Sequence, residues 1–179
     1  QLGDRPAVRV RFRNNQIFLM VPLPEHGKNA DVIVDFTKIL LRHCGKDWDA
    51  FHPITLQKQG VPGVEPDTCF YVTNRQAILG KRRFDLAHDP PPDLAIETDL
   101  TSITDINDYQ PFAVPEVWIY QADHLRIYQF AQGDYMEVNT SPLFPDFPVK
   151  DMLPATVKRA WEVGTSQALR EFEQQLMQH

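Results

Sequence analysis

The stretch PPDLAIETDLTSI, residues 91–103, sets three carboxylates into an otherwise apolar segment. Alternate residues of an extended strand share a face, so Asp93, Glu97 and Asp99 point to one side and the aliphatic residues between them to the other. A carboxylate on a buried strand is costly unless it is paired or coordinates a cation. The pattern leaves two interpretations open: an edge strand with its acidic face in water, or a central strand that carries a site.

The spacing of these acids makes Glu97 the central candidate. Two residues of strand span about 6.6 Å, so Glu97 and Asp99 could flank one site. Asp93 lies about 13 Å from Glu97, which is too far for both to bind one ion from a straight strand.

A second acidic segment, GVEPDTCFYV at residues 63–72, has a similar layout. Both segments contain a Pro-Asp pair followed by an apolar run. Two strands of this kind could pair and bring Asp67 near Glu97. Converging carboxylates form a hard-oxygen site, which suits Mg²⁺ or Mn²⁺.

The length of 179 residues predicts a single domain over residues 1–179. The apolar runs are too short to cross a bilayer, and the first residues lack the charged-then-apolar layout of a secretory signal. We therefore expect a cytoplasmic protein with no membrane partner. In that compartment Cys44 and Cys69 are expected as free thiols, although a disulfide between them stays open.

The net charge of −6 argues against a general polyanion-binding protein, because phosphate contacts supply most non-specific affinity for nucleic acids. A local basic patch is still possible. Arg9, Arg11 and Arg13 alternate with apolar residues, so a strand there presents three guanidinium groups on one face. This face is either a solvated edge or a track for phosphates.

The order of predicted elements is rich in strands, with helices at the flanks. We expect a hairpin of strands at about 7–13 and 16–21 around Asn14-Asn15, and a helix capped by Asn29 that stops at Gly45. Strands are expected in FHPITLQ, DTCFYVTN and DLAIETDL, short helices in RQAILGKRRF and before Pro111, and a three-stranded meander from Glu116 onward. A C-terminal helix is predicted at about 154–177. This order indicates an α/β fold of the α+β kind.

Four motifs in this order, VEPDTCFYV, PPDLAIETDLTS, VPEVWIY and SPLFPDFPV, closely resemble the Uma-two family of bacterial endonuclease-like proteins. The resemblance covers a core of about residues 16–153, and the four motifs together are specific. It implies membership of the PD-(D/E)XK nuclease superfamily. The implied fold is restriction-endonuclease-like: a mixed central sheet flanked by helices, with active-site carboxylates on neighbouring strands.

Position by position, the resemblance implies roles for the acidic residues. Asp67 matches the first metal-binding aspartate, and Glu97 matches the acid of the (D/E)XK element. Asp93 matches the second Pro-Asp and would orient the site, and Asp99 is a further candidate for the catalytic set. Glu65, just before the first of these strands, is a candidate supporting carboxylate. Glu116, in the motif VPEVWIY, is either a surface charge or a supporting partner of the site, and the surface is the favoured interpretation.

The resemblance also implies a lysine that this chain lacks. In the superfamily a lysine two residues after the acid positions the attacking water, and Asp99 stands there. Related sequences often carry the lysine in a Thr-Ser-Lys-Thr run, where this chain has Ile103. A metal held by the carboxylates could still lower the pKa of a bound water, but activity should suffer. Lys81 or Lys58 could supply the charge from another element.

We therefore predict a divalent-metal-dependent DNA endonuclease that hydrolyses phosphodiester bonds, with Mg²⁺ or Mn²⁺ and no small-molecule cofactor. The alternative is a catalytically impaired nuclease fold that binds DNA or protein, which Ile103 and the acidic net charge favour. DNA is the expected partner. A homodimer is plausible because cutting both strands of a duplex calls for two sites.

Overall fold

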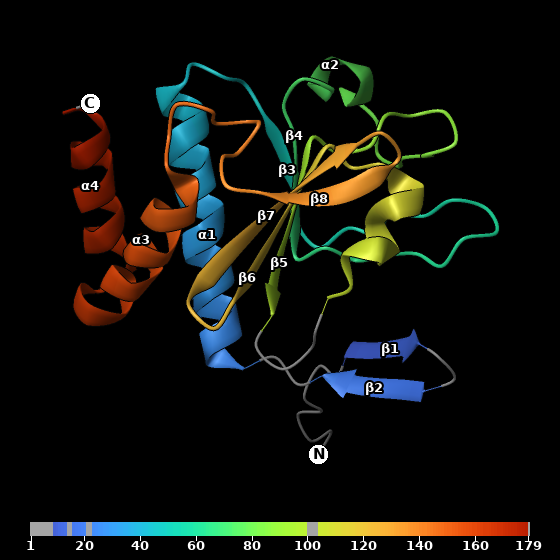
Figure 1. Ribbon diagram of the computed structural model, residues 1–179, viewed down its shortest axis with the longest axis horizontal. Helices are drawn as coiled ribbons and strands as arrows, with labels where there is room; N and C mark the ends of the chain where they lie inside the picture. Colours follow the sequence, from blue (N-terminus) through green and yellow to red (C-terminus); the bar gives the residue numbers. More distant parts are fainter. Residues whose placement is uncertain (1–8, 14–15, 21–22, 100–103, 179) are drawn as a thin grey trace.

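The computed structural model of the protein describes residues 9–13 and 16–20 as backbone, and residues 23–99 and 104–178 with their side chains (Figure 1). Its main sheet has six strands in the order β3-β4-β5-β6-β7-β8. β5 and β6 run parallel and the other neighbouring pairs run antiparallel, so the sheet is mixed. The strands span Asp49–Phe51, Thr68–Tyr71, Leu94–Asp99, Glu116–Gln121, His124–Ala131 and Asp134–Val138.

β5, the strand of the acidic segment, lies inside this sheet. β4 pairs with it on one side and β6 on the other. All six residues of β5 are buried. The interpretation of this segment as an edge strand with its acidic face in water is therefore wrong, and its carboxylates need partners within the protein.

α1 (Pro24–His43) and α3 (Val149–Val163) cover one face of the sheet, and α4 (Thr165–Leu176) packs against these two helices on the side away from the sheet (Figure 1). Their apolar residues form one core with the strand residues of that face. Full burial of one large apolar side chain contributes about 1.5–3 kcal/mol. The strand residues in this core include Phe70, Leu94, Ile96, Trp118, Tyr120, Leu125 and Ile127.

α1 begins earlier than the sequence predicts. Pro24 takes its first position, where a missing N–H costs nothing, so Asn29 is not the N-cap. Asn29 is instead buried, and its Oδ1 accepts a hydrogen bond of 2.8 Å from Nε1 of Trp161, whose ring is half exposed. The predicted end holds, since Gly45 adopts a φ of 63° just after the C-cap.

The other face of the sheet is covered by η1 (Ile106–Phe112), a 3₁₀ helix that includes Pro111 rather than ending before it. Tyr109 and Phe112 of this helix pack with Val117 and Ile119 of β6 in a second apolar cluster. This packing follows from alternation along the strands, because residues of β5 and β6 point to the two faces in turn.

Two helices replace the single C-terminal helix predicted at about 154–177. α3 already begins at Val149, and Gly164 separates it from α4. Gly164 has a φ of 89°, which residues with a side chain rarely adopt. The chain therefore turns at this glycine and packs both helices against α1.

The predicted meander is confirmed as β6, β7 and β8, with turns of positive φ at Ala122-Asp123 and Gln132-Gly133. The strand predicted in FHPITLQ is wrong: β3 ends at Phe51, and beyond it an isolated bridge joins Leu56 to Val64. The helix predicted in RQAILGKRRF is shorter than expected, because α2 spans only Arg75–Ile78.

At the N-terminal end, β1 (Arg9–Arg13) pairs antiparallel with β2 (Gln16–Met20) in a separate two-stranded sheet. The predicted turn at Asn14-Asn15 lies outside the described residues.

Glu116, at the start of β6, is buried rather than at the surface. Its Oε1 accepts hydrogen bonds from Trp118 Nε1 at 2.5 Å and Ser141 Oγ at 2.6 Å, and its Oε2 accepts one from the backbone N–H of Leu143 at 2.9 Å. Burial raises the pKa of this carboxyl, while the three hydrogen bonds and the charge of Lys46 oppose the rise. Glu116 thus ties the proline-rich segment before α3 to the sheet.

Among the described residues, no helix combines the length and the apolar character that a membrane span requires. Both cysteines are free thiols, as predicted.

Candidate functional site

Asp67 and Glu97 come together at one end of the central strands. Thr68 of β4 pairs with Ile96 of β5, so the next step of the register sets Asp67 opposite Glu97. Oδ2 of Asp67 accepts a hydrogen bond of 2.9 Å from the backbone N–H of Thr98. The predicted pairing of the two Pro-Asp strands is therefore confirmed. Metal binding by these two carboxylates stays a prediction.

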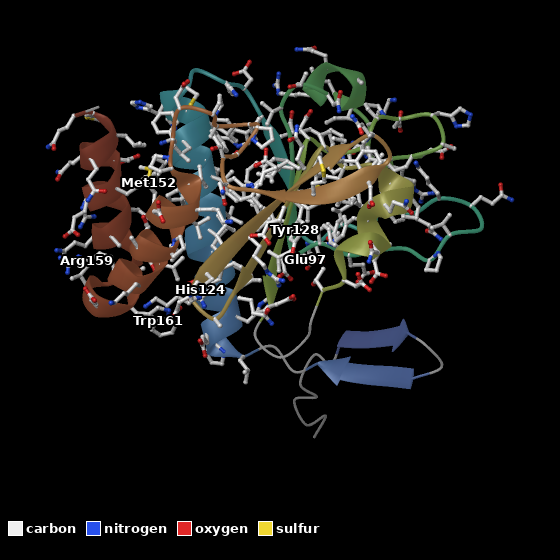
Figure 2. The ribbon with its side chains drawn as sticks, in the orientation of Figure 1. Glu97, His124, Tyr128, Met152, Arg159 and Trp161 are labelled. Atoms are coloured by element: carbon white, nitrogen blue, oxygen red, sulfur yellow. The ribbon has the colours of Figure 1, made fainter. Side chains whose placement is uncertain are left out.

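Glu97 is enclosed, with 4 % of its surface exposed (Figure 2). The hydroxyl of Tyr109 donates a hydrogen bond of 2.6 Å to Oε1 of Glu97. Tyr109 was not predicted from the sequence as a site residue. The signal for it in the sequence is weak: a tyrosine shortly after the acidic strand, in a segment predicted to be a brief helix.

His26, in the first turn of α1, is a second residue that the sequence analysis missed. Its Nε2 lies 3.2 Å from Oδ2 of Asp67, and its side chain is 29 % exposed. The N-terminal end of α1 therefore reaches the same end of the sheet as Asp67 and Glu97. Pro24 was the signal that could have identified His26. A helix that begins at this proline, rather than after Asn29, includes His26 in its first turn.

Asp99 and Asp93 lie on the same strand as Glu97 but make other contacts. The carboxylate of Asp99 accepts hydrogen bonds from the backbone N–H of Thr104 at 2.7 Å and from its hydroxyl at 2.9 Å. Oδ2 of Asp93 accepts hydrogen bonds from the backbone N–H groups of Val72 at 2.7 Å and Asn74 at 3.0 Å, at the far end of β5. Asp93 and Glu97 therefore lie apart in the structure. This agrees with the spacing along the strand, which predicted that they are too far apart to bind one ion.

The two remaining candidates lie in loops. Oε1 of Glu65 accepts a hydrogen bond of 2.9 Å from the hydroxyl of Thr55. The ammonium group of Lys81 pairs with Asp89 in the exposed loop after α2. Both predicted supporting roles stay predictions, and Ile103, the position of the missing lysine, lies outside the described residues.

The donor set at Asp67 and Glu97 fits a divalent cation of the Mg²⁺ type. Within residues 23–99 and 104–178, no group of three or more histidine, cysteine or acidic side chains is arranged so that it could hold a metal ion. Mg²⁺ keeps several waters and is commonly held by one or two carboxylates together with substrate phosphates. By their chemistry, two carboxylate donors therefore suit Mg²⁺ or Mn²⁺ better than a structural zinc ion.

Cys69 lies on β4 two residues after Asp67, but it is not a nucleophile. It is fully buried, and burial raises the pKa of its thiol to about 12. The reactive form of cysteine is the thiolate. Covalent catalysis by this residue is therefore excluded near neutral pH.

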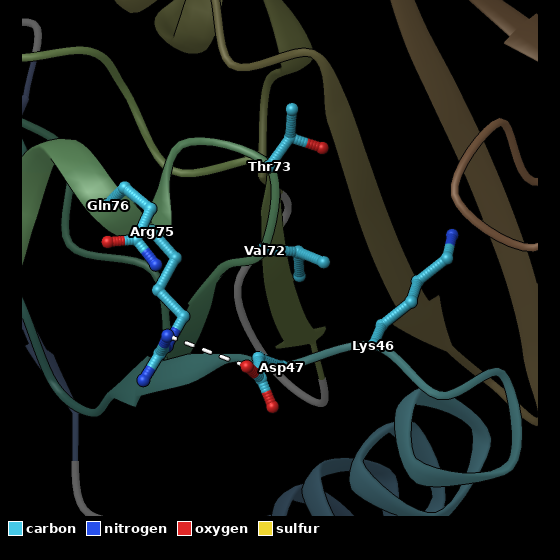
Figure 3. A pocket seen from close by; sticks show the side chains of 6 residues that line it. All are labelled: Lys46, Asp47, Val72, Thr73, Arg75 and Gln76. Carbon is cyan, nitrogen blue, oxygen red and sulfur yellow. Dashed lines mark ion pairs between the residues drawn. The ribbon is translucent and has the colours of Figure 1, made fainter.

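A pocket of about 290 Å³ opens beside Val72, which follows β4 at the end opposite Asp67 (Figure 3). Arg75 in this pocket forms an ion pair of 3.7 Å with Asp47, and Lys46 donates a hydrogen bond of 2.6 Å to the carbonyl of Leu143. Its cations are thus engaged by the protein itself. The lining residues, which include none of the predicted site residues, are Lys46, Asp47, Val72, Thr73, Arg75 and Gln76.

Comparisons with known proteins identify the family and the fold of the chain. The sequence pattern of the Uma2 family, described as "Putative restriction endonuclease", matches residues 1–162. No curated protein matches the chain. Among solved structures, one similar protein is described as "a putative nuclease belonging to DUF820 from Anabaena variabilis ATCC 29413". Its TM-score is 0.55 at 13 % identity, over 89 % of this chain and 90 % of that one.

At that identity the structural likeness shows the fold: a mixed sheet of six strands with flanking helices, of the α+β kind. The family pattern covers most of the sequence, including both Pro-Asp strands and the meander. The chain therefore belongs to the Uma2 family, as its four motifs indicated.

Proposed function

We propose that this protein is a divalent-metal-dependent endonuclease that hydrolyses phosphodiester bonds of DNA, with Asp67 and Glu97 as metal ligands. The observation that carries the proposal is the register of β4 and β5, in which Thr68 pairs with Ile96, so that continuing it by one residue puts Asp67 opposite Glu97. Family membership supports the reaction class.

The residues of the proposed site have different roles. When bound, Mg²⁺ or Mn²⁺ supplies charge to polarise the phosphoryl group and lowers the pKa of a bound water. Asp67 and Glu97 hold that ion from two neighbouring strands. Nε2 of His26 lies 3.2 Å from Oδ2 of Asp67, so this imidazole contacts the proposed ligand from the first turn of α1, in a site that lacks the usual lysine.

A second candidate function is a nuclease fold without catalysis that binds DNA or protein. The observation that favours it is the role of Asp99, which holds Thr104 where the superfamily has a lysine. An anion at this position cannot supply the cationic charge that aims the attacking water. The acidic net charge points the same way.

Cleavage of supercoiled plasmid in Mg²⁺ and in Mn²⁺ tests the proposal, with Asp67→Asn and Glu97→Gln as variants. We expect the parent to nick or linearise the plasmid, and each variant to lose about 100-fold or more of that activity, because loss of a ligand should exceed the 10- to 100-fold cost of losing a group that supports one. Asp31→Asn is the matched control, since Asp31 is exposed on α1.

Equal cleavage by parent and variants would refute the assignment of these ligands. Salt-sensitive DNA binding by a parent that does not cleave would select the second function, and neither binding nor cleavage would indicate a protein partner. We also propose a homodimer for cleavage of duplex DNA, because each strand needs a site. Light scattering in the presence of duplex DNA would measure it.

A further inference from the structure

We propose that Tyr109 is a positioning residue that fixes the Glu97 carboxylate for metal binding. The inference rests on the proposed function. The hydroxyl of Tyr109 donates a hydrogen bond of 2.6 Å to Oε1 of Glu97, and this pair is buried. A short bond from a neutral donor to a carboxylate in a buried site is strong and directional.

Tyr109 itself is held rigidly. Its side chain is fully buried and packs in the apolar cluster with Phe112, Val117 and Ile119. A ring packed in this way cannot change rotamer without opening a cavity. The position of its hydroxyl is therefore set by the core and not by the mobility of a surface side chain.

The helix that carries Tyr109 is tied to the rest of the protein along its length. The carbonyl of Pro111 accepts a hydrogen bond of 2.8 Å from Lys58 Nζ, and Gln110 Nε2 donates one of 3.2 Å to the carbonyl of Gly133. At the other end, Asp105 caps the helix through a bond of 3.1 Å from the backbone N–H of Asn107. The bonds to Lys58 and Gly133 join η1 to two separate loops, so the helix does not move freely over the sheet.

The consequence for Glu97 is a loss of conformational freedom before any ion binds. Glutamate is among the side chains that give up the most rotamer entropy when they are ordered. Because Tyr109 holds Oε1 before an ion arrives, most of this rotamer entropy is lost when the protein folds rather than when the ion binds. Carboxylates that bind metals are themselves hydrogen-bonded in most sites, and loss of such a partner weakens metal affinity by 10- to 100-fold.

Tyr109→Phe tests this inference, because it removes the hydroxyl and keeps the ring. Tyr135→Phe is the matched control. Tyr135 packs against the same apolar cluster, and its hydroxyl donates to the backbone carbonyls of Val114 at 2.9 Å and of Tyr109 at 3.5 Å rather than to Glu97. Mn²⁺ affinity is measured by titration calorimetry on the parent, both phenylalanine variants and Glu97→Gln, with urea unfolding of each protein alongside.

We expect Tyr109→Phe to bind Mn²⁺ about tenfold or more weakly than the parent. Tyr135→Phe should bind like the parent, although both variants lose a comparable amount of stability. A merely structural tyrosine would lower the urea midpoint without a specific loss of Mn²⁺ affinity.

The outcomes separate this inference from the proposed function. If Glu97→Gln loses Mn²⁺ and Tyr109→Phe does not, the positioning role is refuted and the metal site stands. Equal losses of affinity in Tyr109→Phe and Tyr135→Phe would also refute it, since they would report general loosening. If Glu97→Gln binds like the parent, or the parent does not bind Mn²⁺, the metal site itself is refuted and the inference falls with it.

Discussion

Replacement of Ser141 by alanine should destabilise the protein strongly for so small a change. Ser141 is fully buried, and its Oγ donates a hydrogen bond of 2.6 Å to Glu116 and accepts one of 3.1 Å from the backbone N–H of Phe144. The backbone N–H of Phe144 keeps a second acceptor in the variant, the backbone carbonyl of residue 141 at 3.2 Å, so it is not orphaned. A bond to a charged group is worth about 1.5–3 kcal/mol, and we expect a loss of that size.

Urea unfolding followed by circular dichroism measures this loss. At an m-value of about 2 kcal/mol/M, the midpoint should fall by about 0.7–1.5 M while m stays constant. Ser166→Ala, at an exposed position of α4, is the control and should stay within about 0.5 kcal/mol of the parent. In a double-mutant cycle with Glu116→Ala, Ser141→Ala should cost less than it does alone, because the carboxylate that it served is gone.

The loss should also depend on pH. Ser141 lowers the pKa of Glu116, whose carboxyl is raised above its ordinary value of 4.5 by burial, so Ser141→Ala raises that pKa further. A carboxyl with a raised folded pKa contributes its stability below the unfolded pKa and loses it as the pH rises through the folded one. The variant must therefore lose more stability than the parent as the pH rises above about 4.5. A midpoint equal to that of the parent, or a difference that is constant over this range, would refute the reasoning.

Three further changes test other parts of the fold. Asp93→Ala leaves two backbone N–H groups without their acceptor and should cost about 2–4 kcal/mol in urea unfolding; lost Mn²⁺ affinity at unchanged stability would instead assign Asp93 to the metal site. Gly164→Ala forces a side chain into a φ of 89° and should cost about 1–2 kcal/mol, which an unchanged Tm would contradict. Arg159 lowers the pKa of exposed Glu171 to about 2, so the parent loses this contribution as the pH falls from 4.5 to 2. Glu171→Gln should lack that acid-side slope, and identical pH profiles would show that the pair contributes nothing.

Much of the centre of the sheet could be predicted because the signals there are local. Alternation along β5 separates its carboxylates from its aliphatic residues, and the structure places the aliphatic set against the helices. The pairing of β4 with β5 followed from two similar starts, each with Pro-Asp. Whether the strand was central or at an edge could not be predicted in the same way, since it depends on which strands lie on both sides of it.

The contacts to the two site carboxylates could not be predicted, because they join distant parts of the chain. His26 and Asp67 are brought together by the packing of α1 on the sheet, and the sequence pattern placed the start of α1 several residues too late. Glu116 looked like a surface charge because its partners are a serine and a backbone N–H in a proline-rich segment far along the chain. Helix starts and loop contacts of this kind are decided by tertiary packing rather than by periodicity.

The role of Asp99 changes the meaning of the missing lysine. Asp99, at the position where the superfamily has a lysine, has a structural role. Its carboxylate accepts two hydrogen bonds from Thr104. Thr104 lies at the start of the segment that leads into η1, and η1 places the Tyr109 hydroxyl on Glu97. An aspartate here therefore helps to order the carboxylate that we propose as a metal ligand, and it cannot supply the cationic charge of the missing lysine. In the proposed enzyme His26 Nε2 contacts Asp67 at 3.2 Å, so His26→Ala should lower plasmid cleavage, and cleavage equal to that of the parent would show that His26 has no part in it.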